Sequence, residues 1–226
     1  MRANTIRVWV FAGAAPVGAI LLTLSAILSI TGAAGQPRPV PTERVLVPVT
    51  QRATLYEEDP ADPEGKSYLG SAVWRTETMA ETGAMPELAV RCDIDFPDRQ
   101  LAMTLVMRRN TDPALPASHT VEIVFQLPAD PAYGGISNLA GILMKQDERS
   151  RGISLAARAV EVTAGSFLVG LSSIDAEKER NLLLLKERAW FDIAVVYGTG
   201  RRALIAFEKG SPGERAFKDA FAAWEQ

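Results

Sequence analysis

The chain has 226 residues, of which 47% are hydrophobic and 23% are charged, and its formal net charge is −3. Beyond Arg2 and Arg7, which precede the first long apolar stretch, the chain holds 22 basic against 27 acidic residues. This acidic balance argues against nucleic acid as a partner, because such binding needs concentrated lysine and arginine. Cys92 is the single cysteine, so no intrachain disulfide can form and the core alone must hold the domain.

An uncharged apolar run extends from Val8 to Ile30. A helix of that length, at ~1.5 Å per residue, would cross the ~30 Å hydrocarbon core of a bilayer. Arg2 and Arg7 precede the run, so the positive-inside rule predicts that residues 1–7 form a cytoplasmic tail. We therefore expect a single-pass anchor in the inner membrane at residues 8–30, with the C-terminal domain in the periplasm.

Two alternatives to the anchor stay open at this point. The run could be a signal sequence that is removed near Ala34, since small residues occupy positions 32–35. It could also be a buried helix of a soluble protein.

Residues 31–44 contain alternating prolines, Pro37, Pro39 and Pro41, which predict an extended spacer. The remaining residues, 45–226, predict one periplasmic domain, and about 180 residues are enough to bury a core.

Three segments near the start of this domain predict short strands: Val45–Val49, Ala53–Glu57 and Tyr68–Glu77. The connection Glu57–Glu64 carries five carboxylates. Its spacing lacks the alternation of a calcium loop and its prolines restrict its folding, so we expect a solvated acidic hairpin loop and no metal site.

The clearest pattern is the period of two in the large apolar residues of three central segments, 88–96, 101–107 and 121–127. In the first segment, Arg91, Asp93 and Asp95 alternate with apolar residues. Strands with one buried and one solvated face are typical of an antiparallel sheet. By contrast, the segment from Tyr133 to Gly141 shows no clear period, and we expect a long loop or crossover there.

The C-terminal third mixes hairpins with helices. Strands are predicted at Val160–Thr163 and Phe167–Leu171, then at Phe191–Tyr197 and Ala203–Phe207. A helix is predicted over Asp175–Arg188, because acidic residues begin it and basic residues end it.

A second helix is expected to start at a capping box formed by Ser211 and Glu214. Phe217, Phe221 and Trp224 recur along it at helical spacing, so this helix should pack on a sheet. The elements together predict an α+β domain, mainly antiparallel β and sandwich-like, with two C-terminal helices and preceded by the transmembrane helix.

The best candidate for a binding site is the polar segment, residues 108–119, that lies between the second and third of the three central segments. Two guanidiniums near amide and hydroxyl groups could bind a phosphate or carboxylate, although adjacent arginines on a strand face opposite sides. Cross-strand pairing of these arginines with Asp93 or Asp95 is the competing structural interpretation. The candidate residues are Arg108, Arg109, Asn110, Asp112, Ser118 and His119.

Catalytic chemistry has little support in the sequence. His119 is the only histidine, which excludes sites that need two imidazoles, and the adjacent Ser118 should point to the opposite face. A strand-end histidine bonded to the backbone is the structural alternative to a general base. Cys92 has the parity of the buried face, so we expect an inert thiol there.

Several segments of the exported part are similar to those of a known class of proteins. They are Leu55–Pro60, Trp74–Glu77, Arg109–Asp112, Leu115–His119, Leu185–Phe191 and Glu208–Phe217. Together they resemble uncharacterised membrane-anchored envelope proteins of Gram-negative bacteria, a class without an established activity, so the resemblance implies an address and no functional residue. The C-terminal order of helix, hairpin and final helix is similar to the invasion-associated locus B family of periplasmic proteins, from which this chain departs by lacking their cysteines.

The leading hypothesis is a non-enzymatic, tethered module, without cofactor or metal, that binds an envelope protein or assists envelope assembly. One alternative is a hydrolase or anion-binding site around His119. Another is an apolar small-molecule site between the sheet and the final helix.

Overall fold

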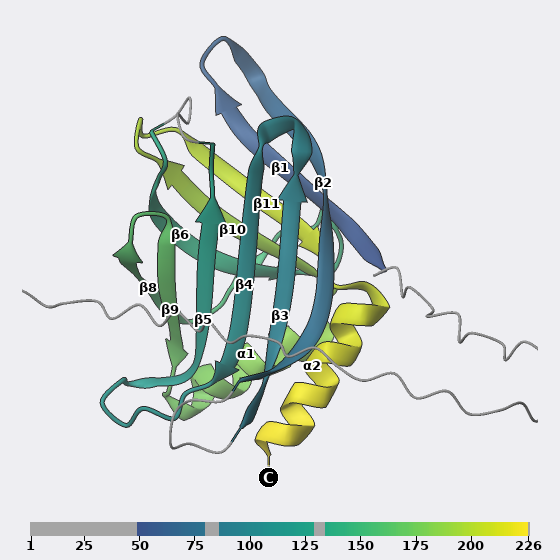
Figure 1. The fold of residues 1–226 in the computed structure, drawn as a ribbon, viewed down its shortest axis with the longest axis vertical. Helices are drawn as coiled ribbons and strands as arrows, with labels where there is room; N and C mark the ends of the chain where they lie inside the picture. The colour runs from purple at the N-terminus through teal and green to yellow at the C-terminus, as the bar shows by residue number, and fades with distance from the viewer. Residues whose placement is uncertain (1–48, 80–85, 129–133, 226) are drawn as a thin grey trace, which may run out of the picture. The chain divides into compact units, whose positions relative to one another are not determined.

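The computed structural model describes residues 49–79, 86–128 and 134–225, and the predicted anchor and spacer lie outside these ranges. Within them the chain forms eleven strands and two α-helices (Figure 1). The strands are β1 (Thr50–Asp59), β2 (Asp62–Met79), β3 (Glu87–Phe96), β4 (Leu101–Arg109), β5 (Ala117–Gln126), β6 (Ile136–Lys145), β7 (Ile153–Ser154), β8 (Ala157–Thr163), β9 (Ser166–Ser172), β10 (Trp190–Tyr197) and β11 (Arg202–Glu208). The helices are α1 (Asp175–Glu187) and α2 (Gly210–Trp224), and a 3-10 turn spans Pro97–Arg99.

The strands form one curled sheet in the order β7-β6-β10-β11-β1-β2-β3-β4-β5-β9-β8 (Figure 1). Every pair of neighbours is antiparallel. The mainly antiparallel prediction is confirmed. The structure has a single sheet where a sandwich-like arrangement was expected.

The two ends of this sheet are joined by two consecutive residues. The amide of Leu155 donates to the carbonyl of Ile142 on β6 at 2.9 Å, while the carbonyl of Ala156 accepts from the amide of Ser172 on β9, also at 2.9 Å. Because β6 and β9 lie near opposite ends of the strand order, these bonds require the sheet to curl.

The concave face of the sheet holds the core. Cys92 lies opposite Trp74 on β2 and Leu105 on β4, and Leu105 in turn lies opposite Ile123 on β5. All four side chains are buried. The alternation seen in the sequence therefore does place one face of β3, β4 and β5 in the core, and Cys92 is buried as predicted.

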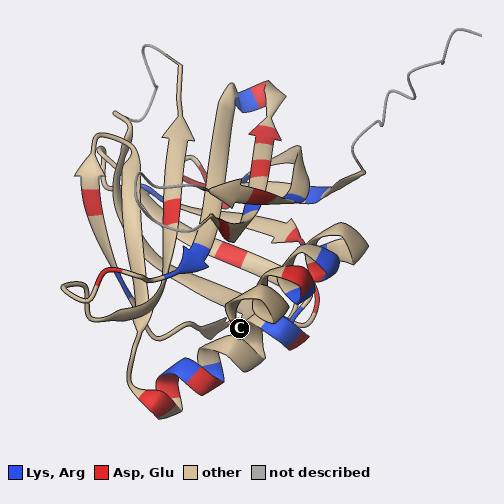
Figure 2. Cartoon of the chain, turned by 60° about the horizontal axis from the view of Figure 1, so that its bottom comes forward, with Lys and Arg blue, Asp and Glu red and all other residues tan. Residues whose placement is uncertain are grey.

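Helix α2 supplies an aromatic face to this core. The ring of Phe217 lies 5.6 Å from that of Trp74 and 5.9 Å from that of Phe191, measured between centroids. At the other end of the helix, the indole of Trp224 donates to the carbonyl of Leu88 at 2.7 Å. Both helices lie at the lower end of the sheet in Figure 1, where α2 contacts β2 and β3. Figure 2 shows acidic and basic residues mixed along α1, and most of these side chains are exposed.

A buried lysine links α1, β11 and α2. Lys209, which is 1% exposed, donates from Nζ to the carbonyls of Leu185 and Arg188 at 2.8 and 2.9 Å. These carbonyls lie at the C-terminal end of α1. The last carbonyls of a helix have no amide partner within the helix and carry partial negative charge, so they suit the ammonium of Lys209. Burial lowers the pKa of Lys209 to about 8, although Glu214 opposes the shift.

Three local predictions are wrong or fall outside the described residues. The segment from Tyr133 to Gly141, expected to be a loop or crossover, contributes residues 136–141 to β6. The pairing of β6 with β10 shifts register twice, so the buried residues of β6 do not follow a period of two. The capping box is absent, because the carbonyl of Lys209 accepts from Gly213 and the helix begins at Gly210. Of the strand predicted at 45–49, only Val49 is described, and it is not in a strand.

The packing of α2 leads to a stability prediction. We expect Phe217→Ala to lower the free energy of unfolding by about 3–5 kcal/mol, because it removes a buried ring from the aromatic cluster and leaves a cavity. Lys218→Ala, on the exposed side of the same helix, should change it by less than about 0.5 kcal/mol. Urea unfolding followed by circular dichroism measures both. Equal effects of the two substitutions would contradict the packing described for α2.

Candidate functional site

The two arginines of the predicted site are bound to acidic residues of the neighbouring strands. Arg108 pairs with Glu122 of β5 at 3.2 Å and Arg109 with Glu87 of β3 at 2.9 Å. The expected pairing across the sheet is present, but with these glutamates. Asp93 instead accepts hydrogen bonds from Arg75, Arg91 and Thr104. Burial alone would raise the pKa of Asp93, but these hydrogen bonds lower it below its usual value.

Asn110 organises the loop between β4 and β5. Its side-chain amide donates to the carbonyls of Asp112, Leu115 and Ala117 at 2.8–3.0 Å, and its side-chain oxygen accepts from the amide of Asp112. The Asp112 carboxylate accepts from the amide of Ala114 at 2.8 Å. The polar atoms of Asn110 thus hold the loop in place, which is a structural task.

Ser118 and His119 are closer together than the sequence predicts. A register shift between β5 and β9 at this point brings Ser118 Oγ within 3.2 Å of His119 Nδ1, so the expectation of opposite faces is wrong. The imidazole is buried and lies 5.0 Å from the ring of Trp224. Burial, together with the charges of Lys178 and Arg109, lowers the pKa of His119 to about 4. The ring is therefore neutral and a weak base at neutral pH.

The position of the single thiol, that of Cys92, makes it unreactive. Cys92 is fully buried, and burial raises the pKa of its thiol well above the usual value. A nucleophilic thiolate needs an exposed, electropositive setting. The described structure thus places Cys92 in the core.

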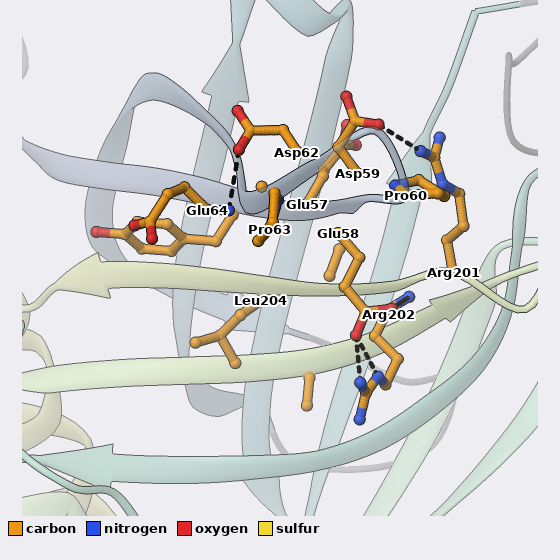
Figure 3. A pocket seen from close by; sticks show the side chains of 14 residues that line it. Glu57, Glu58, Asp59, Pro60, Asp62, Pro63, Glu64, Arg201, Arg202 and Leu204 are labelled. Carbon is orange, nitrogen blue, oxygen red and sulfur yellow. Dashed lines mark hydrogen bonds and ion pairs between the residues drawn. The ribbon is translucent and has the colours of Figure 1, made fainter.

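A hollow of about 630 Å³ lies beside the β1–β2 hairpin and contains the acidic segment singled out in the sequence (Figure 3). Glu58 and Asp59 point toward Arg202 and Arg201 at the turn between β10 and β11 (Figure 3). The Asp62 carboxylate instead accepts from the backbone amide of Glu64 at 3.0 Å. Arg202 binds Glu58 and lowers the pKa of that carboxyl, while Lys66 at 2.7 Å lowers the pKa of Asp59. Arg201 also contacts Asp59, at 3.3 Å.

Glu57, the first residue of that segment, is buried on the concave face. It accepts from Arg99 at 3.1 Å and from the hydroxyl of Tyr197. Most carboxylates of the hollow are thus engaged by the protein itself. Across the described ranges, no group of three or more histidine, cysteine, aspartate or glutamate side chains is placed to hold a metal ion.

A polar cluster on the outer face of the sheet fixes the loop between β6 and β7. Lys145 lies 2.8 Å from Asp192 and donates to the carbonyl of Glu148 at 2.6 Å. The Glu148 carboxylate accepts from Thr54 and Tyr56, each at 3.2 Å. Burial raises the pKa of Asp192 even though Lys145 opposes the shift. These contacts hold the loop that leads into the junction between the two ends of the sheet.

An open groove of about 670 Å³ lies on the outer side of β5, β9 and β8. A Cβ added to Gly170 would meet that of Ala117 at 3.1 Å, so the bare glycine allows these strands to approach closely at the floor of the groove. Its apolar lining includes Leu115, Pro116, Ala117, Val160 and Leu168, and Arg158 and Glu177 add charge at its rim.

Strand β8 continues this groove as an apolar surface. Val160 and Val162 are 57% and 64% exposed, and Val124 on the neighbouring outer face of β5 is 39% exposed. Leu168 lies opposite Val160 in the sheet. We define this surface, Val124, Val160, Val162 and Leu168, as the β8 patch.

The sequence contained part of the signal for this patch. It predicts the hairpin of β8 and β9 from two short apolar runs around Ala164 and Gly165. It does not show that β8 ends the strand order, because that depends on pairings between distant segments.

Comparison with known proteins gives no relative. No family model, curated protein or solved structure matches the chain. Among the described helices, neither is long and apolar enough to cross a bilayer.

The buried imidazole gives a pH prediction. Its pKa is about 4 in the folded protein and about 6.5 in an unfolded chain, so the unfolded state binds more protons between these values. Stability should therefore be fully present above pH 6.5 and fall toward pH 4, by about 3 kcal/mol from this group.

His119→Gln, which cannot gain this proton, should flatten that part of the profile. The free energy of unfolding, measured by urea titration from pH 4 to pH 7.5 for both proteins, tests the assignment. Parallel profiles would show that the imidazole is not buried as described.

Proposed function

We propose that this chain is a membrane-tethered module of the periplasm that binds a protein of the cell envelope. The observation that carries the proposal is the β8 patch. Large exposed apolar surfaces on soluble domains mark interaction sites more often than isolated exposed residues do. Here two half-exposed valines on one strand adjoin an apolar groove.

The chemistry of the predicted polar site favours binding over catalysis. The imidazole is neutral and packed on Trp224, and both Arg108 and Arg109 are paired with glutamates. The aromatic rings of α2 fill the space between this helix and the sheet, so the apolar surface that remains accessible is on the outside. An open outer surface suits a protein better than a small molecule, which needs a concave pocket that encloses it.

The tether belongs to the same proposal. Residues 8–30 would hold the domain at the inner membrane, and residues 31–44 would act as the spacer. Tethering raises the effective concentration of the domain toward partners in the same membrane, so a patch of modest area can suffice.

Site-specific photo-crosslinking in cells tests the patch. We expect a chain carrying p-benzoyl-phenylalanine in place of Val162 to form a covalent adduct with an envelope protein. The same residue in place of Leu69 should give no such adduct. Leu69 is a matched control, because it is 77% exposed and lies on β2, five strands from β8 in the sheet order.

A second substitution separates specific from adventitious adducts. Val160→Lys should remove the adduct formed at position 162, because it places a charge in the apolar surface, whereas Leu69→Lys should leave it unchanged. Equal adducts at positions 162 and 69, or none at 162, would contradict a docking role of the β8 patch.

The tether makes an independent prediction about the mature chain. Intact-mass spectrometry of the protein from native membranes should find an N-terminus at or directly after Met1. A mature chain that starts near Gly35 would show that the run is a removed signal sequence.

A further inference from the structure

Strand β8 is the last strand of the sheet, and it is open to solvent on several sides. Among the described strands, it pairs only with β9. Six of its seven residues are exposed, and Ala159 is half-buried. Ala159 packs against the core, and β8 approaches β6 without forming a ladder with it. The other six side chains of β8 are exposed.

The register of β8 shows which backbone groups remain open. Ala156 and Ser172 face each other in a hydrogen-bonded pair, since the amide of Ser172 donates to the carbonyl of Ala156. Hydrogen-bonded and non-bonded pairs alternate along an antiparallel ladder. Arg158 and Val160 therefore direct their backbone groups toward β9.

The intervening residues, Ala157, Ala159 and Glu161, direct their amides and carbonyls to the open edge. A row of donors and acceptors at this spacing is complementary to one kind of ligand, an extended polypeptide.

We propose that the partner binds by adding an extended segment to β8 as a further antiparallel strand of the sheet. This inference rests on the proposed function and specifies its mode: backbone hydrogen bonds at Ala157, Ala159 and Glu161 supply the main contacts. The valines of the β8 patch lie beside the added segment and select β-branched or other apolar residues on its outer face.

The charges of β8 specify the segment further. Arg158 points to the outer face and Glu161 to the inner face, and neither forms an ion pair within the described residues. Directly opposite residues in a sheet share a face and interact. The partner segment therefore carries an acidic residue opposite Arg158 and, three positions away, a basic residue opposite Glu161.

A second copy of this chain does not meet that requirement. In an antiparallel pair of two β8 strands, Arg158 would lie opposite a valine or another outer-face residue, never opposite Glu161 of the other copy. The charge pattern thus favours a different protein as the occupant.

A synthetic strand tests this mode directly. The probe is a fluorescently labelled, end-blocked heptapeptide, Val-Lys-Val-Thr-Asp-Val-Thr, which in antiparallel register puts lysine opposite Glu161 and aspartate opposite Arg158. We expect saturable binding to the full chain in detergent micelles, measured by fluorescence anisotropy. Exchanging lysine and aspartate, or N-methylating the central threonine, should weaken binding about tenfold, which corresponds to about 1.4 kcal/mol of lost contacts.

Substitutions in the chain probe the same hydrogen bonds. Ala159→Pro removes an outward amide and leaves the ladder to β9 intact, so it should weaken the probe about tenfold. Ala159→Thr keeps the amide and should change affinity by less than about twofold. Far-ultraviolet circular dichroism checks folding, and the N-methylated probe tests the wild-type chain should the proline variant not fold.

The outcomes separate this mode from the proposed function. No saturable binding up to about 1 mM, or equal binding of the parent and N-methylated probes, overturns strand addition. If the adduct at position 162 persists in that case, the patch still binds a partner by another geometry. If the adduct is absent as well, the proposed function fails too.

Discussion

The constraint on which the structure depends is that one sheet has to bury one apolar face without a second sheet to cover it. It does so by curling, with Leu155 and Ala156 bonded to strands near opposite ends of the order. Helix α2 then fills the lower end of the concave face with Phe217 and Trp224. The buried ammonium of Lys209 couples α2 to the end of α1, so the helices and the sheet form one packed unit.

This construction determines where the surface can act. Burial on the concave face removes Cys92 and His119 from solvent, and the polar groups around Arg109 and Asn110 are used to hold strands and a loop. Joining the sheet at Ala156 leaves the rest of β8 with one ladder partner among the described strands, β9, and with most of its side chains exposed. The exposed apolar side chains and open backbone groups of that strand are thus a consequence of how the sheet closes, and the proposed binding role rests on them.

Much of the fold could be predicted, because local patterns encode it. The alternation in β3, β4 and β5 and the aromatic spacing of α2 each reflect a buried face that the sequence displays directly. Strand β6 was missed because its bulges against β10 space the buried residues Ile136, Leu139 and Ile142 by three. For the candidate site, the sequence places Arg108, Arg109 and His119 in one segment. Glu122, which pairs with Arg108, is on the same strand as His119, but Glu87 and Trp224, which contact Arg109 and His119, come from other elements of the chain.

Residue-resolved amide exchange of the full chain, measured by NMR in detergent micelles, tests whether the edge of β8 is open. An open edge predicts an alternation along the strand. The amides of Arg158 and Val160, bonded to β9, exchange slowly, while those of Ala157, Ala159 and Glu161 exchange rapidly. Slow exchange at all five amides would mean that the edge is already covered. Rapid exchange at all five would mean that β8 is not a stable strand, and either result would rule out strand addition at an open β8 edge.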